Sequence, residues 1–235
     1  MSLSTLLQNI ADAEQGPKTC AVFDFDGTII SGYSATAFLK DQIARGEISP
    51  ADLVQLTQAA TRFGIGSLGF SALMAVHAQY LAGRSEADYV ANSERLFRKA
   101  IAKLIYPEAR QLIEAHRAAG HSIAIISSAT PYQVLPAARD LCIEHVYATD
   151  LEVEDGQFTG SVVQPTCFGI GKVHAAERFT AQQGSDLENC FFYSDSTDDI
   201  ELLEMAGRPV VLNGSRDLKK TAREAGWPMA DFSSR

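Results

Sequence analysis

The sequence has no long apolar run, no paired cysteine motif and no excess of basic residues. No stretch approaches the roughly 20 apolar residues that cross a bilayer, and Met1–Gln15 has no basic segment ahead of an apolar run. We therefore expect neither a signal peptide nor a membrane partner. The formal net charge of −9 also argues against nucleic-acid binding, which needs clustered lysine and arginine. A cytoplasmic protein is the resulting expectation.

The remaining bulk properties are those of an ordinary globular protein. The 235 residues suffice for one large domain or for a core with a smaller insertion, and 46% of them are hydrophobic. Nothing in the pattern indicates an oligomeric state. The scattered cysteines form no CxxC pair, which predicts reduced and mostly buried thiols at Cys20, Cys142, Cys167 and Cys190.

Two contrasting patterns open the chain. The apolar run Thr19–Phe25 leads into an Asp-Gly-Thr turn and predicts a buried strand. Residues 34–105 then carry apolar side chains at helical spacing, punctuated by glycines. This second pattern predicts about four helices without an intervening strand, as in a bundle-like insertion.

From Pro107 onward, the pattern predicts alternating helices and strands. Asp155-Gly156 between two short apolar runs predicts a β-hairpin. The alternation favours an α/β fold with a doubly wound, mainly parallel sheet, which binds ligands at the carboxyl ends of its strands. The predicted helices span 107–119, 132–141, 172–182, 198–205 and 215–225, and the strands 122–127, 145–148, 190–193 and 209–212.

The first predicted strand ends in two carboxylates, Asp24 and Asp26. Both enter one crevice if the chain turns at Gly27, which adopts backbone conformations that most residues resist. A carboxylate can attack phosphorus, and a protonated carboxyl can donate a proton to a leaving alkoxide. Asp24 suits the first role and Asp26 the second. The alternative is an aspartate-rich turn whose side chains bond only the local backbone.

Three later segments carry polar side chains at comparable places. Ser127 follows the second strand, where its hydroxyl either holds a phosphoryl oxygen or caps a helix. Lys172 opens a helix against the helix dipole, so it either faces solvent or meets an anion. Asp195, Asp198 and Asp199 follow another strand and either bind a hard cation or begin a helix.

Together these segments resemble the four motifs of the haloacid dehalogenase-like (HAD) phosphatases, and within them the phosphoserine-phosphatase-like branch. The resemblance runs from about Thr19 to Gly226. The family usually has glycine where this chain has Ser194, a departure that we expect to matter little. The motifs are Asp24-Phe25-Asp26-Gly27-Thr28, Ser127, Lys172 and the run Ser194–Asp199.

The resemblance implies a Rossmann-like core formed by residues 1–32 and 106–235. A helical-bundle cap, residues 33–105, would be inserted after the first strand. Asp24 would be the nucleophile that forms a transient aspartyl-phosphate. Asp26 would be the general acid and then the base that activates water.

The resemblance also implies the groups that hold phosphate and metal. Lys172 would neutralise Asp24 as well as bind a phosphoryl oxygen. The implied phosphate-binding residues are Gly27, Thr28, Ser127 and Lys172. The implied Mg²⁺ ligands are Asp24, Asp26 through its backbone carbonyl, Asp195 and Asp199.

The cap should select the substrate. Phosphoserine phosphatases place a glutamate soon after the nucleophile and an arginine in the cap. Here the first position is near Tyr33, without an acid, and residues 63–83 contain neither arginine nor lysine. Phe70 either meets an apolar leaving group or belongs to the cap core, and His77 is either packed or a substrate ligand. The candidate substrate contacts are Tyr33, Phe70 and His77.

The sequence thus predicts a magnesium-dependent phosphomonoester hydrolase for a small organic phosphate. The alternatives are histidinol phosphate or another amino-alcohol or lipid-related phosphate as substrate, or a phosphotransferase. A non-catalytic binding module is disfavoured because no motif residue is missing. Asp26 separates the chain from dehalogenases, which have no alkoxide to protonate.

Overall fold

The computed structural model describes residues 1–47 and 67–232. Within them, a six-stranded sheet has the order β3-β2-β1-β6-β7-β8, and every pair of neighbouring strands is parallel. This confirms the predicted α/β fold with a mainly parallel sheet. The strands are β1 (Cys20–Phe23), β2 (Ser122–Ile126), β3 (His145–Tyr147), β6 (Cys190–Ser194), β7 (Arg208–Leu212) and β8 (Met229–Ala230).

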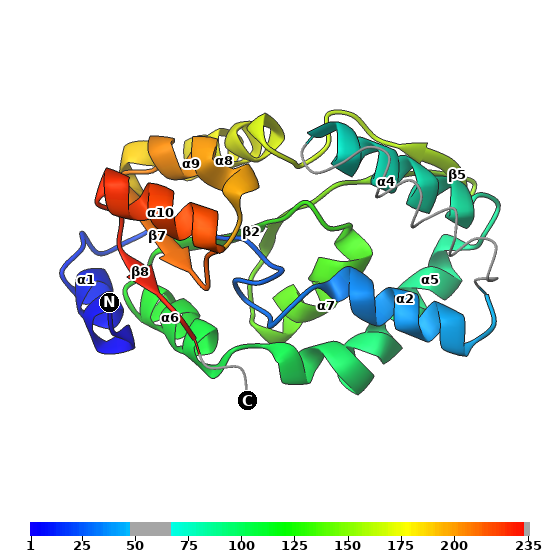
Figure 1. The fold of residues 1–235 in the computed structure, drawn as a ribbon, viewed down its shortest axis with the longest axis horizontal. Coiled ribbons are helices and arrows are strands. Elements are labelled where there is room, and N and C mark those ends of the chain that lie inside the picture. Colours follow the sequence, from blue (N-terminus) through cyan, green and yellow to red (C-terminus); the bar gives the residue numbers. More distant parts are fainter. Residues whose placement is uncertain (48–66, 233–235) are drawn as a thin grey trace.

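Strand β1 explains why helices cover both faces of the sheet. Its four residues are fully buried, with Ala21 and Phe23 in one apolar cluster and Cys20 and Val22 in another. Side chains alternate across a strand, so a strand that is apolar on both faces needs cover on both. One face is covered by α1 (Leu3–Ala11), α6 (Pro107–Ala118) and α7 (Pro131–Asp140), and the other by α8 (Ile170–Gln182), α9 (Ile200–Met205) and α10 (Arg216–Ala225) (Figure 1).

The predicted helical insertion lies at one end of the molecule, away from α1 (Figure 1). It contains α2 (Ser34–Ala44), α4 (Ser67–Leu81) and α5 (Glu86–Leu96), followed by a π-turn at Phe97–Ile101 and a 3₁₀ turn at Ala102–Leu104. Ser85 starts α5 by accepting a hydrogen bond from Asp88 N, as an N-cap serine does. The expectation of about four helices also covered residues 48–66, which lie outside the described residues.

The predicted hairpin forms, but it packs on the helical insertion and not in the main sheet. Strands β4 (Leu151–Glu154) and β5 (Gln157–Val162) flank Asp155 and Gly156, whose φ angles of 50° and 74° suit a tight hairpin turn. Gly83 N donates to Phe158 O at 2.8 Å, at the end of α4. The division at residue 106 stays a prediction, and these contacts add residues 151–162 to the helical side.

The sheet brings three strand ends to one edge. Strand β1 lies between β2 and β6, and Phe23 is in register with Ile125 and Tyr193. The residues that follow these three strands therefore leave the sheet at the same place, which is where parallel sheets bind ligands.

Two composition-based predictions can also be compared with the fold. All four cysteines are free, and three of them are buried, with Cys142 exposed, which confirms the prediction. In the part of the chain that the structure describes, no helix has the length and apolar character needed to cross a membrane.

Candidate active site

Lys172 lies at the centre of a buried charge cluster. Its side chain is buried, and Nζ donates to Asp24 Oδ1 at 2.8 Å and to Asp199 Oδ2 at 2.9 Å. The backbone just before the lysine packs closely on the preceding loop. A Cβ at Gly171 would come within 2.0 Å of Thr166 O, so only glycine lets α8 begin this close to the preceding loop.

Asp199 is held from two sides but keeps one oxygen unpartnered. Its Oδ2 accepts from Lys172 and also from Ser194 Oγ at 2.6 Å. Its buried Oδ1 has no hydrogen-bond partner within residues 1–47 and 67–232. The hydroxyl of Ser194, where the family usually has glycine, thus contacts Asp199 directly, and the expectation that this departure matters little stays a prediction. A buried carboxylate oxygen is costly unless water or a cation completes it.

Asp195 lies against the turn that follows β1. A Cβ at Gly27 would come within 2.0 Å of Asp195 Oδ2, and the φ of Gly27 is 77°. Thr28 Oγ1 donates to Asp195 Oδ1 at 3.5 Å, and Asn213 Nδ2 donates to Gly27 O at 2.9 Å. Any side chain at position 27 would displace the Asp195 carboxylate, so the turn requires glycine for space as well as for conformation.

Asp26 is half-buried and is held by the start of α2. Ser34 donates from its backbone N to Asp26 Oδ1 at 2.6 Å and from Oγ to Oδ2 at 3.0 Å. Burial raises the pKa of Asp26 to about 6, although the two bonds from Ser34 lower it. A carboxyl with such a pKa can hold or release a proton near neutral pH.

The cluster contains more carboxyl groups than ammonium groups. Burial raises the pKa of Asp24 to about 7, with Lys172 opposing the shift, and raises the pKa of Asp195 to about 8, with Asp24 adding to it. Burial alone would lower the pKa of Lys172, but Asp199 and Asp24 raise it, so the ammonium stays charged. The buried ammonium pairs directly with Asp24 and Asp199, and its charge also lowers the pKa of Asp26 and Asp195.

This donor set fits a hard divalent cation. Across the described ranges, no three side chains of His, Cys, Asp or Glu converge on one point. An ion would therefore need backbone, phosphate or water oxygens beside carboxylates, which Mg²⁺ commonly takes. The unpartnered Oδ1 of Asp199 and the surplus of carboxylates are consistent with such an ion. The ligand set Asp24, Asp26, Asp195 and Asp199 stays a prediction.

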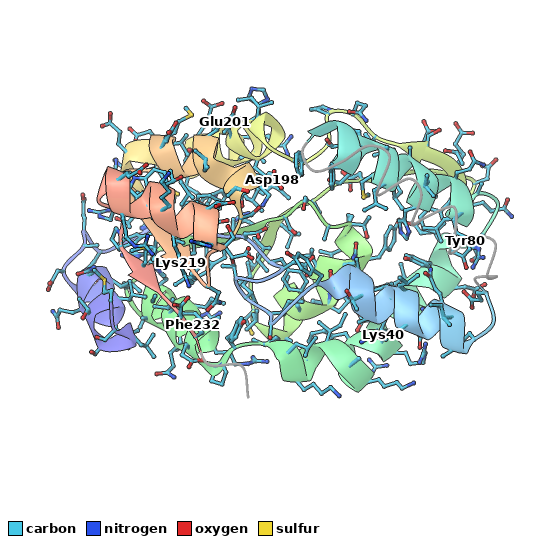
Figure 2. All side chains as sticks on the ribbon, in the orientation of Figure 1. Lys40, Tyr80, Asp198, Glu201, Lys219 and Phe232 are labelled. Atoms are coloured by element: carbon cyan, nitrogen blue, oxygen red, sulfur yellow. The ribbon has the colours of Figure 1, made fainter. Side chains whose placement is uncertain are left out.

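Ser127 and Asp198 lie around this cluster. Ser127 is buried after β2, and its Oγ accepts from Ala129 N at 3.2 Å, which leaves the hydroxyl proton for another acceptor. Asp198 N donates to Ser196 Oγ, so Asp198 belongs to a short helical turn. Figure 2 shows Asp198 on the side of the core that faces α4, with Lys219 and Phe232 farther from the cap.

The three candidate substrate contacts lie in different surroundings. Tyr33 is 66% exposed; burial raises its pKa and the nearby acids, Asp195 first, add to the shift. Phe70 stacks on Phe168 with ring centroids 4.3 Å apart, which joins α4 to the segment before Lys172. His77 is half-buried, and burial lowers its pKa to about 4. No hydrogen bond or ion pair of the described residues joins His77 to the carboxylates.

Sequence reasoning missed three residues that hold the site, and it placed a fourth, Ser194, in a motif without giving it a role. Ser34, Gln133, Ser194 and Asn213 all donate to a motif residue or to its partner. Only Gln133 has a local signal, because Thr130 and Gln133 have the spacing of a capping box. The other contacts join segments that are far apart or read as ordinary loop residues.

Comparisons with known proteins identify the family to which the chain is similar. The family model described as haloacid dehalogenase-like hydrolase matches residues 21–204. A phosphoserine phosphatase of Mycobacterium tuberculosis is 34% identical over 217 residues, which cover 90% of this chain and 70% of that protein. A histidinol-phosphatase of Neisseria meningitidis is 29% identical over 220 residues, covering 92% and 99%. A crystal structure of a protein of unknown function from Bordetella pertussis has a TM-score of 0.81 and 28% identity, covering 90% and 97%.

Proposed function

The chain belongs to the haloacid dehalogenase-like hydrolases and is a phosphatase of that family, and from this premise we propose that it hydrolyses small organic phosphomonoesters through an aspartyl-phosphate on Asp24. The observation that carries the proposal is the Asp24–Lys172 pair, 2.8 Å long and buried at the carboxyl end of the central strand. Lys172 opposes the rise in pKa that burial causes at Asp24, which favours the ionised carboxylate, the form that attacks phosphorus.

In the first proposed step, a carboxylate oxygen of Asp24 attacks the phosphorus of the ester. The bond from phosphorus to the leaving oxygen breaks, and Asp26 gives its proton to that oxygen, so an alcohol departs. Ser127 and Lys172 would hold the phosphoryl oxygens during transfer. The raised pKa of Asp26, about 6, supports its role as the proton donor.

In the second step, a water molecule gives a proton to Asp26 and attacks the same phosphorus. The bond between phosphorus and Asp24 breaks, phosphate leaves, and both aspartates return to their starting state. Mg²⁺ bound near Asp24, Asp195 and the Asp26 carbonyl would neutralise charge on the transferring phosphoryl group. The surplus of carboxylates over Lys172 supports a divalent cation here.

The substrate is proposed to be a small alkyl phosphate. Two relatives are named phosphoserine phosphatase and histidinol-phosphatase. An amino-alcohol phosphate such as histidinol phosphate is a second candidate, supported by the exposed Tyr33 beside several carboxylates. An aromatic ring and negative charge together favour a cationic leaving group over an anionic one. A phosphotransferase would differ only in the acceptor of the second step.

The test is hydrolysis of a panel of phosphomonoesters with and without Mg²⁺. The panel contains para-nitrophenyl phosphate, phosphoserine, histidinol phosphate, phosphocholine and lysophosphatidic acid. We expect Mg²⁺-dependent release of phosphate that Asp24→Asn abolishes and that Asp217→Asn, an exposed aspartate on α10, leaves intact. Activity that survives Asp24→Asn would contradict the proposed nucleophile. Transfer of phosphate to added alcohols would favour the phosphotransferase.

A further inference from the structure

Within residues 1–47 and 67–232, the hydrogen bonds to the Asp26 carboxyl all come from one residue of the cap side. Ser34 donates to both of its oxygens, from N at 2.6 Å and from Oγ at 3.0 Å. Ser34 is the first residue of α2, and the preceding Tyr33 makes no side-chain cap. Asp26 thus accepts from the helix N-terminus in place of a cap residue, and this contact defines how the carboxyl is turned.

A second buried residue defines the direction of the Ser34 hydroxyl. Gln133, on α7, donates from Nε2 to Ser34 Oγ at 3.0 Å. A hydroxyl has one proton to donate, and with a donor already on its oxygen that proton is directed to Asp26 Oδ2. Ser34 is fully buried and Gln133 is 8% exposed, so water does not compete for these bonds.

The orientation of the Gln133 amide is itself determined. Its Oε1 accepts from Thr130 N and from Thr130 Oγ1, both at 2.9 Å. A backbone N–H can only donate, so the amide oxygen faces Thr130 and the NH₂ group faces Ser34. The result is one chain of hydrogen bonds, each with a defined donor, that links Thr130 through Gln133 and Ser34 to Asp26. It runs from the loop after Ser127 to the first turn of α2.

We propose that Gln133, acting through Ser34, is the positioning residue that orients the Asp26 carboxyl for proton transfer to the leaving group. The inference rests on the proposed function, because it needs Asp26 to act as an acid. If these hydrogen bonds were only structural, they would join α7 to α2. Their loss would then lower stability but would reduce the hydrolysis of all esters equally, whatever the leaving group. Proton donation matters most for a poor leaving group such as an alkoxide, and little for para-nitrophenolate.

The experiment compares kcat/KM for para-nitrophenyl phosphate with kcat/KM for the alkyl phosphate that the wild type hydrolyses fastest. kcat/KM reports departure of the leaving group and is independent of the later hydrolysis of the aspartyl-phosphate, which both substrates share. For Gln133→Met, which keeps the length of the side chain and removes both hydrogen-bonding groups, we expect about a tenfold or greater loss for the alkyl ester. For para-nitrophenyl phosphate we expect a loss of less than about threefold.

Two variants separate positioning from stability. Tyr132→Phe removes the bond from the neighbouring Tyr132 Oη to Glu86 Oε1, 2.8 Å long, and so weakens a separate contact between α7 and the cap, the one with α5. It should lower Tm without changing the ratio of the two kcat/KM values. Ser34→Ala should reproduce the selective loss, and adding Gln133→Met to it should cause no further change, because Gln133 acts through Ser34.

The outcomes are distinct. Equal losses for both esters in Gln133→Met and Ser34→Ala, or no loss in either, would overturn the positioning role while leaving the proposed function intact. A wild type that hydrolyses only para-nitrophenyl phosphate would overturn it too, since no proton donor is then used. A wild type that hydrolyses neither ester would overturn the proposed function itself.

Discussion

Two buried polar clusters share strand β6, and they are built on opposite principles. The cluster around Lys172 collects carboxylates at the carboxyl ends of the strands. The other joins His116, His121 and Tyr193 beneath α1 and α6, on the face of the sheet that carries Phe23. Tyr193 immediately precedes Ser194, so the two clusters are adjacent in the chain. They differ in charge and in whether every polar atom has a hydrogen-bond partner.

The histidine cluster is neutral and its protons are fully assigned by its partners. His121 Nε2 faces Glu14 O at 3.1 Å, and a carbonyl only accepts, so Nε2 carries the proton. His121 Nδ1 must then accept from His116 Nδ1 at 2.8 Å, and His116 Nε2 must accept from Tyr193 Oη at 2.8 Å. Each polar atom has a partner, and burial lowers the pKa of both histidines.

The comparison separates a polar cluster that stabilises the fold from one that is prepared for a ligand. Around Lys172 the charges do not balance, and Asp199 Oδ1 lacks a partner among the described residues. Around His116, every polar side-chain atom of the cluster has a hydrogen-bond partner. Completed networks rigidify a core, whereas unbalanced buried charges with shifted pKa values concentrate at functional sites.

The largest effect should follow from removing the ammonium of Lys172, the only one that the described residues bring to the charged cluster. Lys172→Met leaves Asp24 and Asp199 buried without a counter-charge. We expect the free energy of unfolding to fall by about 3–5 kcal/mol, as when one partner of a buried ion pair is removed, and hydrolysis to be lost. Chemical denaturation at neutral pH measures the first and phosphate release the second.

The matched control is Lys219→Met, which breaks the exposed Lys219–Asp231 pair of 2.7 Å. It should cost less than about 1 kcal/mol, because exposed pairs contribute little. If Lys172→Met is as stable as this control, Lys172 does not balance the buried carboxylates.

A smaller and purely structural effect is expected from the neutral cluster. His116→Phe leaves the Tyr193 hydroxyl and His121 Nδ1 without hydrogen-bond partners. We expect a loss of about 2–3 kcal/mol of unfolding free energy with kcat/KM unchanged well below Tm, since unpaired buried polar groups are costly. The double variant with Tyr193→Phe should recover part of the loss. A large fall in kcat/KM of the folded His116→Phe protein would show that this cluster also serves the site.

The two clusters should also respond to pH with opposite sign. His116 and His121 have pKa values below their usual 6.5, so their contribution is complete above that pH and is lost as the pH falls, because the unfolded chain then binds more protons. Asp24 and Asp195 have raised pKa values, so their contribution is complete below the usual 3.8 and is lost as the pH rises toward about 7 and 8.

Asp24 and Asp195 titrate over the same pH range in both proteins, so the difference between the wild type and His116→Phe isolates the contribution of His116. Between about pH 6.5 and pH 4.5, His116→Phe should lose less stability than the wild type, by up to about 1.4 kcal/mol per pH unit. Denaturation curves in EDTA at several pH values measure the difference. Parallel curves for the two proteins would mean that His116 is not held neutral in the fold.

The charged cluster could be predicted from sequence, and the neutral one could not. Asp24 and Asp195 each follow an apolar strand, and Lys172 opens a periodic helix, so local pattern plus motif order locates all three. The contact between His116 and Tyr193 spans 77 residues, and neither residue lies in a motif. The same reason hides the bond from Gln133 to Ser34, which spans 99 residues.

The fold shows the same limit. Apolar periodicity located the strands from β1 to β7 and the helices of the core to within a few residues. Strand β8 has two residues, Met229 and Ala230, too few to show an alternating pattern. The hairpin was predicted from Asp155-Gly156, but its partner was not, because turn residues specify a local bend and not the surface that it contacts.

The smallest expected effect is stabilisation by Mg²⁺. It directly tests the excess of carboxyl groups over the Lys172 ammonium. A divalent ion must compete with protons for Asp24 and Asp195, whose pKa values are about 7 and 8 in its absence. Saturating Mg²⁺ should therefore raise the free energy of unfolding by about 1–2 kcal/mol near pH 8 and by much less near pH 5.5. Thermal denaturation with Mg²⁺ or EDTA measures this, and Asp195→Asn should remove most of the stabilisation, whereas His116→Phe should keep it. An equal Mg²⁺ effect at both pH values, or one that survives Asp195→Asn, would place the ion elsewhere, and the surplus carboxylates would then be balanced by protons alone.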